Sequence, residues 1–126
     1  MKSFIGAMVI FAFIFAGTGY YSKVLSAEIN HLEQRLSEVT DCLQHDDWEG
    51  CKEKTDALMH DWNKAQKWLK SIVNHKEIDL ILQTLYEMKG YVDVENKDEA
   101  LIKAGVLKMF FQHIPENEAL SIMNIL

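Results

Sequence analysis

Turn-forming residues are scarce in this sequence. Its 126 residues include a single proline, Pro115, and 6 glycines, of which Gly6, Gly17 and Gly19 fall within the first 19 residues. β-Sandwiches and barrels need frequent turns, and glycine and proline supply most of them. The scarcity excludes these folds, and the length predicts one compact helical domain with a short appendage.

Positive charge is also in short supply. Lys2 is the only charged residue among residues 1–22, and residues 23–126 hold 12 Lys and Arg against 19 Asp and Glu, a net charge of −7. Such a surface repels nucleic acid and anionic lipid headgroups. We therefore expect no nucleic-acid partner and, if there is a protein partner, one with a neutral or basic surface.

The common catalytic motifs are missing as well. The sequence has no serine flanked by glycines, no glycine-rich phosphate loop and no His-Glu-x-x-His. Its acidic pairs, such as Asp46 with Asp47, stand at predicted helix starts, where the helix dipole accounts for them. We expect a protein that is not an enzyme and that has no catalytic residues, cofactor or metal.

What the sequence does have is one strongly apolar segment, residues 1–22. No charge occurs from Ser3 to Ser22, and Phe4 to Ala16 is an uninterrupted apolar run. About 20 helical residues cross a hydrocarbon core, so residues 1–22 predict a membrane anchor. A signal peptide cleaved near Gly17 and Gly19 is one alternative, and a buried core helix is another.

The flanking charges predict the orientation of this segment. Lys2 and the terminal amine favour a cytoplasmic N-terminus, although Lys23 weakens the bias. Residues 23–126 would then form an extracytoplasmic domain, secreted if the segment is cleaved. The two cysteines, Cys42 and Cys51, are not spaced as zinc ligands. They predict either a disulfide across a turn or two small, partly buried thiols.

Apolar residues recur every three or four positions along the rest of the chain, which is typical of helices with one buried face. The first series can continue from the apolar segment as one rod, bent near Gly17 and Gly19. Pro115 predicts the end of the fourth helix and a short last helix from Glu116 to about Met123. We predict an all-α fold: a transmembrane or signal-anchor helix, then an antiparallel four-helix bundle with a short C-terminal helix. The four series are Leu25 to Leu43, Trp48 to Ile72, Ile78 to Val92 and Ala100 to Ile114, with predicted N-caps for the last three at Asp46 or Asp47, Asn74, and Asn96 or Asp98.

The best candidate for a ligand or metal site surrounds His75. A helix presents His75 and Asp79 on one face, where a transition metal could use both. The alternative, which we favour, is structural: Asn74 and Glu77 cap the helix, while His75 and Asp79 hydrogen-bond each other or a tryptophan indole. Other histidines in polar stretches are predicted to be solvated: His31, His45 and His60.

Several large apolar residues have two interpretations, as core or as binding surface. For Trp48 and Trp62, on the apolar face of their helix, we favour the core, whereas Trp68 lies beside that face and fits both interpretations. The apolar end of the chain either completes the core or anchors a partner. Its residues are Ile122, Met123, Ile125 and Leu126.

Four features together resemble a known family. They are the N-terminal span, the tryptophan-rich second helix, the stretch Asn74 to Asp79, and the ending His113 to Leu126. The chain resembles, over nearly its whole length, the small bacterial domain-of-unknown-function family forty-three sixty-three. The resemblance implies a membrane-anchored helical protein of spore-forming, often anaerobic, bacteria, encoded in settings similar to those of partners of small multi-span membrane proteins. An anaerobic host would disfavour a disulfide between Cys42 and Cys51.

We therefore predict an interaction or accessory subunit of a membrane protein complex, anchored by one helix. The alternative is an extracytoplasmic bundle that senses or binds a small molecule. A cavity faced by buried His75 and Asp79 would favour the alternative, and a solid core with an exposed apolar strip would favour the first function.

Overall fold

The computed structural model describes the backbone of residues 1–71 and 73–125, and the side chains of residues 1–71 and 73–115. Within these residues the chain forms four α-helices and no strand, which confirms the all-α prediction. The helices are α1 (Lys2–Gln44), α2 (Trp48–Leu69), α3 (His75–Asp93) and α4 (Lys97–Ile125).

The helices begin where the sequence provides caps. The side chains of Asp47, Asn74 and Asn96 each accept a backbone N–H in the first turn of α2, α3 and α4. At the first cap, a Cβ on Gly50 would collide with the Asp47 carboxylate as it is placed here, so a larger residue at position 50 would force the capping side chain to move. The helix starts are thus determined by a few neighbouring residues.

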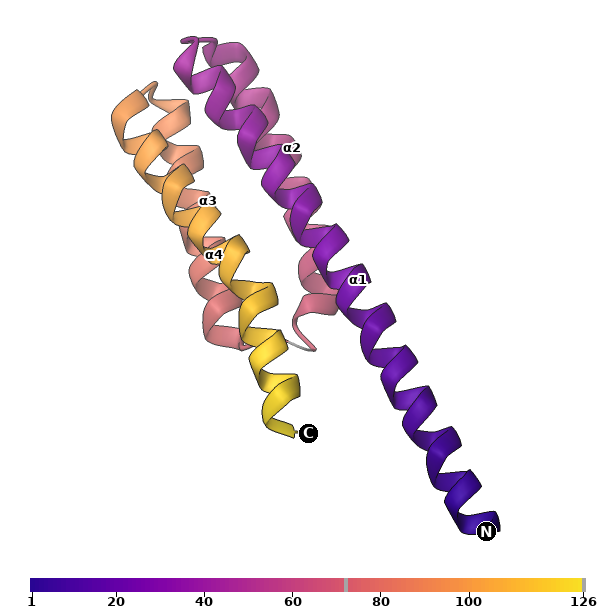
Figure 1. Cartoon of the computed structure of the whole chain (residues 1–126). Helices are drawn as coiled ribbons and strands as arrows, with labels where there is room; N and C mark the ends of the chain where they lie inside the picture. Colours follow the sequence, from indigo (N-terminus) through magenta and orange to yellow (C-terminus); the bar gives the residue numbers. More distant parts are fainter. Residues whose placement is uncertain (72, 126) are drawn as a thin grey trace.

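The four helices surround one solid core. α1 packs against α2 and α4, and α3 packs against the same two helices. In Figure 1 the α1–α2 and α3–α4 connections lie at the same end of the molecule. Trp62 and Phe111 are the largest fully buried side chains, and their ring centroids are 6.1 Å apart. The α1 face of this core is the predicted series without exception: Leu25, Ile29, Leu32, Leu36, Val39 and Leu43.

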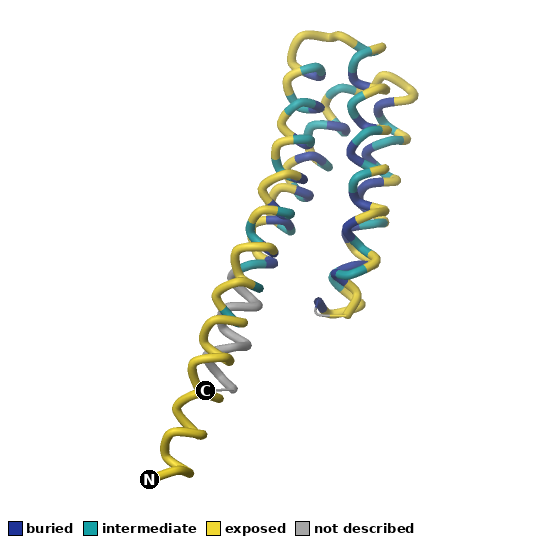
Figure 2. The backbone as a smooth tube through the Cα atoms, turned by 90° about the vertical axis from the view of Figure 1, so that its right-hand side faces the viewer, coloured by how far each residue is buried: buried dark blue, intermediate teal, exposed yellow. Residues whose placement is uncertain are grey.

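α1 extends far beyond the bundle (Figure 1). It spans 43 residues, which corresponds to roughly 65 Å at about 1.5 Å per residue. It continues as helix through Gly17 and Gly19, and Figure 1 shows no bend there, contrary to our expectation. Its residues 2–17 are all exposed, and Figure 2 shows the change to alternating buried positions where the bundle begins.

The predicted end of the fourth helix at Pro115 is wrong. Pro115 lies inside α4, which continues to Ile125, so a separate short C-terminal helix is absent from the described residues. Proline removes one backbone N–H and crowds the preceding turn, but it leaves the remaining helical hydrogen bonds available. The single lost bond did not outweigh the helical preference of the residues on both sides.

Candidate functional site

The two residues that we expected to form a site, His75 and Asp79, are both exposed at the start of α3. No side-chain hydrogen bond or ion pair joins them to each other or to another described residue, so the predicted hydrogen bond between them or to a tryptophan indole is wrong. The buried Trp62 indole N–H also lacks a protein acceptor among the described atoms. Residue spacing placed the pair on one helix face, but that face points to solvent.

The two cysteines do meet. Cys51 is buried, Cys42 is half-buried, and both are free thiols. Burial raises the pKa of Cys51 to about 11, and the neighbouring Cys42 adds to this rise. Burial also raises the pKa of Cys42, while a hydrogen bond with Cys51 acts in the opposite direction. The thiols thus lie next to each other across the α1–α2 turn, and a disulfide between them stays a prediction.

The tryptophans belong mainly to the core. Trp62 is fully buried, and Trp48 and Trp68 are half-buried and pack against the core. The other residues predicted to bind a partner lie at the end of the chain. The side chains of Ile122, Met123 and Ile125, and all of Leu126, lie outside the described part of the chain.

A polar cluster joins α1 to α2, and it includes a histidine that we expected to be simply solvated. Asp61 of α2 accepts a hydrogen bond from Arg35 Nε at 2.8 Å, and its Oδ2 lies 2.9 Å from His31 Nε2. Burial raises the pKa of Asp61, but the hydrogen bonds from Arg35 and His31 outweigh it, so that its pKa lies below the usual value. Glu38 and Lys54 extend the cluster with weaker pairs. This cluster holds two helices together.

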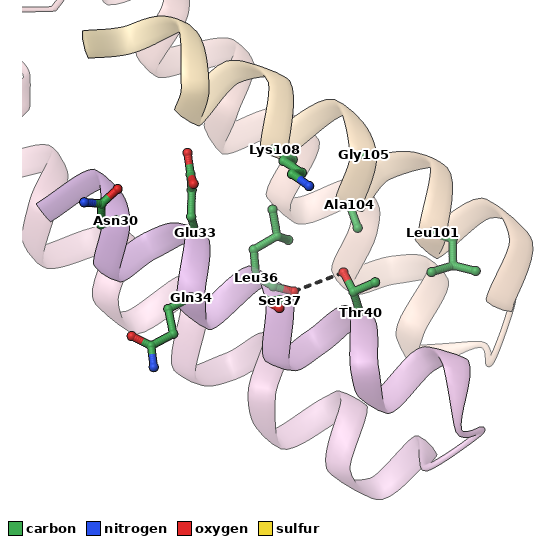
Figure 3. A pocket seen from close by; sticks show the side chains of 10 residues that line it. All are labelled: Asn30, Glu33, Gln34, Leu36, Ser37, Thr40, Leu101, Ala104, Gly105 and Lys108. Atoms are coloured by element: carbon green, nitrogen blue, oxygen red, sulfur yellow. Dashed lines mark hydrogen bonds between the residues drawn. The ribbon is translucent and has the colours of Figure 1, made fainter. Parts of the chain in front are cut away.

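A groove between α1 and α4 has a volume of about 510 Å³. Its floor is apolar, with Leu36 and Ala104 from the core layer. Figure 3 shows the Glu33 side chain on α1 and the Lys108 side chain on α4 reaching into the space between the helices. The remaining lining residues are Asn30, Gln34, Ser37, Thr40, Leu101 and Gly105.

We did not anticipate this groove. Its lining contains both polar and apolar side chains, so no regular spacing of apolar residues indicates it in the sequence. The adjacent small residues Ala104 and Gly105 could have indicated the groove in the sequence, because two small side chains next to each other leave room beside their helix. No group of three or more His, Cys, Asp or Glu side chains that could hold a metal ion occurs among the described residues.

Among known proteins, one family model, described as Domain of unknown function (DUF4363), matches residues 20–125. No curated protein and no solved structure matches the chain. The family match covers most of the chain, so the protein belongs to this family, as the resemblance in the sequence indicated. The match begins near the point where α1 enters the bundle, so it describes the bundle and leaves out most of the apolar segment.

Proposed function

We propose that this member of the DUF4363 family is a non-enzymatic interaction subunit of a membrane protein complex, with an antiparallel four-helix bundle held outside the cytoplasm. One observation carries the proposal: α1 is a single helix that is long and apolar enough to cross a membrane and also forms one wall of the bundle. The bundle is therefore joined to its anchor without a flexible linker.

The exposure of the anchor supports this proposal. Large apolar side chains on all sides of its helix are uncovered, including Phe4 at 69%, Phe11 at 63% and Phe15 at 74%. Water is a poor environment for such a surface, whereas lipid or another membrane protein can cover it. A signal sequence near an N-terminus has the same composition, so the experiment must separate an anchor from a cleaved segment.

The interior of the bundle also supports interaction over ligand sensing. The core is packed with apolar side chains, and the polar cluster around Asp61 connects two helices. The ligand-sensing alternative relied on a cavity at His75 and Asp79, and both are exposed. The groove between α1 and α4 lies on the outside of the bundle, where another protein surface can reach it.

Membrane fractionation of the full chain tests the anchor. The protein should stay in the membrane pellet after alkaline extraction, and a reporter fused after Leu126 should be active only outside the cytoplasm. Two aspartates in the span, Ile10→Asp with Phe13→Asp, should release the protein. A matched control, Tyr86→Asp on α3, changes an apolar residue that is 59% exposed in the bundle and should leave the protein in the pellet.

N-terminal sequencing of the membrane-bound protein completes this test. An intact N-terminus supports an anchor. A mature chain that starts near Tyr20 would overturn it and make the protein secreted. Co-purification from native membranes with mass spectrometry then identifies the complex, and the Tyr86→Asp variant shows which associations depend on the α3 surface.

A further inference from the structure

We infer that the end of the bundle nearest the anchor binds anionic phospholipid headgroups through four lysines, here called the basic end. They lie where α2 ends and α3 begins: Lys64, Lys67, Lys70 and Lys76. The inference rests on the proposed anchoring, because only an anchored chain holds these lysines at a lipid surface. It revises our expectation that the bundle repels anionic lipid, which treated its net charge as evenly spread.

Charge is in fact unevenly distributed along the bundle. Residues 63–76 contain the four lysines and no Asp or Glu. At the opposite end, where α1 is joined to α2 and α3 to α4, residues 45–49 and 93–99 contain seven Asp and Glu and one lysine, Lys97. That lysine pairs with Asp46. The negative charge is therefore concentrated far from the basic end.

The lysines of the basic end are also free to bind an anion. All four are exposed, and none forms an ion pair with another residue in the described part of the chain. Other lysines of the bundle do form such pairs: Lys52, Lys54, Lys89, Lys97 and Lys103. Two acidic residues follow in α3, Glu77 and Asp79, and residues 63–79 still carry four positive charges against two negative ones.

The position of the basic end along α1 places it at the membrane surface. Figure 1 shows α2 running back toward the end of the bundle from which α1 extends. Asp61 of α2 contacts His31 of α1, and Lys70 is nine residues beyond Asp61, or roughly 13 Å at about 1.5 Å per residue. The same distance from His31 along α1 reaches Ser22, the last residue of the uncharged segment. Lys70 therefore lies at the level of the lipid headgroups.

Distance decides which charges the membrane senses. Each lysine at an anionic surface strengthens binding by roughly fivefold, and the effect falls off within the Debye length of about 8 Å. The acidic end of the bundle lies beside Gln44, roughly 30 Å farther along α1 than Ser22, so its repulsion is screened. Trp68, which is half-buried between Lys67 and Lys70 in the sequence, also suits a membrane interface.

Lipid enrichment around the basic end tests the inference, with the full chain reconstituted into phosphatidylcholine vesicles. The variant Ser71→Cys in a Cys42→Ala background carries a fluorophore on an exposed residue next to Lys70, while the fully buried Cys51 is shielded from the label. Phosphatidylglycerol or phosphatidylcholine with a nitroxide near its glycerol quenches the fluorophore at short range. Titrating each lipid gives two apparent association constants. Their ratio should favour phosphatidylglycerol by roughly tenfold, and high salt should bring it close to one.

Two double variants separate the basic end from the net charge. Lys67→Gln with Lys70→Gln should lower the ratio by roughly fivefold or more, because two charges leave the headgroup level. Lys52→Gln with Lys97→Gln is the matched control, since it changes the net charge equally at the acidic end and should lower the ratio by less than about twofold. Circular dichroism should show the same helix content for both, because all four lysines are at the surface.

Equal association of the two lipids with the wild-type sequence at the basic end would overturn the inference. Equal effects of the two double variants would also overturn it, because net charge and not the basic end would then be responsible. If Lys67→Gln with Lys70→Gln leaves the lipid ratio unchanged but loses an acidic protein from native membranes, the lysines bind protein instead of lipid. Alkaline extraction of the vesicles comes first. A chain that is washed off refutes the anchor and this inference together, whereas a retained chain without lipid preference refutes this inference alone.

Discussion

Replacing Asp61 by asparagine tests whether charge in the α1–α2 cluster stabilises the bundle. Asp61 is 16% exposed and lies within hydrogen-bond distance of Arg35 and His31, which are 34% and 47% exposed. Asparagine keeps the shape and one acceptor oxygen but removes the negative charge. A hydrogen bond to a charged group contributes about 1.5–3 kcal/mol when it is buried. Solvent screening at the partners reduces this, so we expect a loss of about 1–2 kcal/mol in the free energy of unfolding at pH 7.

The loss should depend on pH in a defined direction. The folded-state pKa of Asp61 lies below its unfolded value, because the hydrogen bonds from Arg35 and His31 outweigh the effect of burial. The charged carboxylate therefore stabilises the folded state fully above the unfolded pKa of about 3.9, and this contribution disappears as pH falls through the folded pKa. The difference between wild type and Asp61→Asn should be present at pH 7 and shrink below about pH 4, as the carboxylate is protonated.

Urea denaturation of the full chain in detergent, followed by circular dichroism, measures this difference. Urea is preferable to guanidinium because it does not screen charges. Asp56→Asn, on the same helix as Asp61, is the matched control: the Asp56 carboxylate lies 2.9 Å from Lys89 Nζ of α3, but its side chain is 64% exposed. That variant should differ from wild type by less than about 0.5 kcal/mol. Equal effects of the two variants, or a pH-independent Asp61→Asn difference, would refute the reasoning.

Four further outcomes are expected. Trp62→Ala should lower the free energy of unfolding by about 3–5 kcal/mol in the same urea assay, because Trp62 is fully buried against Phe111. In the reduced protein at pH 8, Cys51, with its pKa of about 11, should react with iodoacetamide roughly 100-fold more slowly than an unstructured thiol, and urea should abolish the difference. Asp79→Ala should change stability by less than about 0.5 kcal/mol, because Asp79 is exposed without a described partner. Gly90→Ala should raise the free energy of unfolding by about 0.5–1 kcal/mol, since its Cβ meets nothing and alanine favours the helix; a loss of stability would contradict this.

The sequence by itself determined the features that depend on neighbouring residues. The apolar period predicted the buried face of α1 residue by residue, because residues three and four apart share one side of a helix. Asp47 and Asn74 were identified as caps, because a cap and the N–H that it accepts lie within one turn. The apolar segment was recognised from its length and lack of charge.

The tertiary structure decided which side chains of different helices meet. Asp61 is 26 residues from Arg35, and no local pattern connects them. The groove beside Gly105 and the exposure of His75 depend on the rotation and axial position of whole helices. The expectation that a proline ends a helix also failed for α4, which continues through Pro115. Proline weakens a helix but does not determine where it ends. A helical period specifies which face is apolar, but packing between helices determines what that face and its polar borders touch.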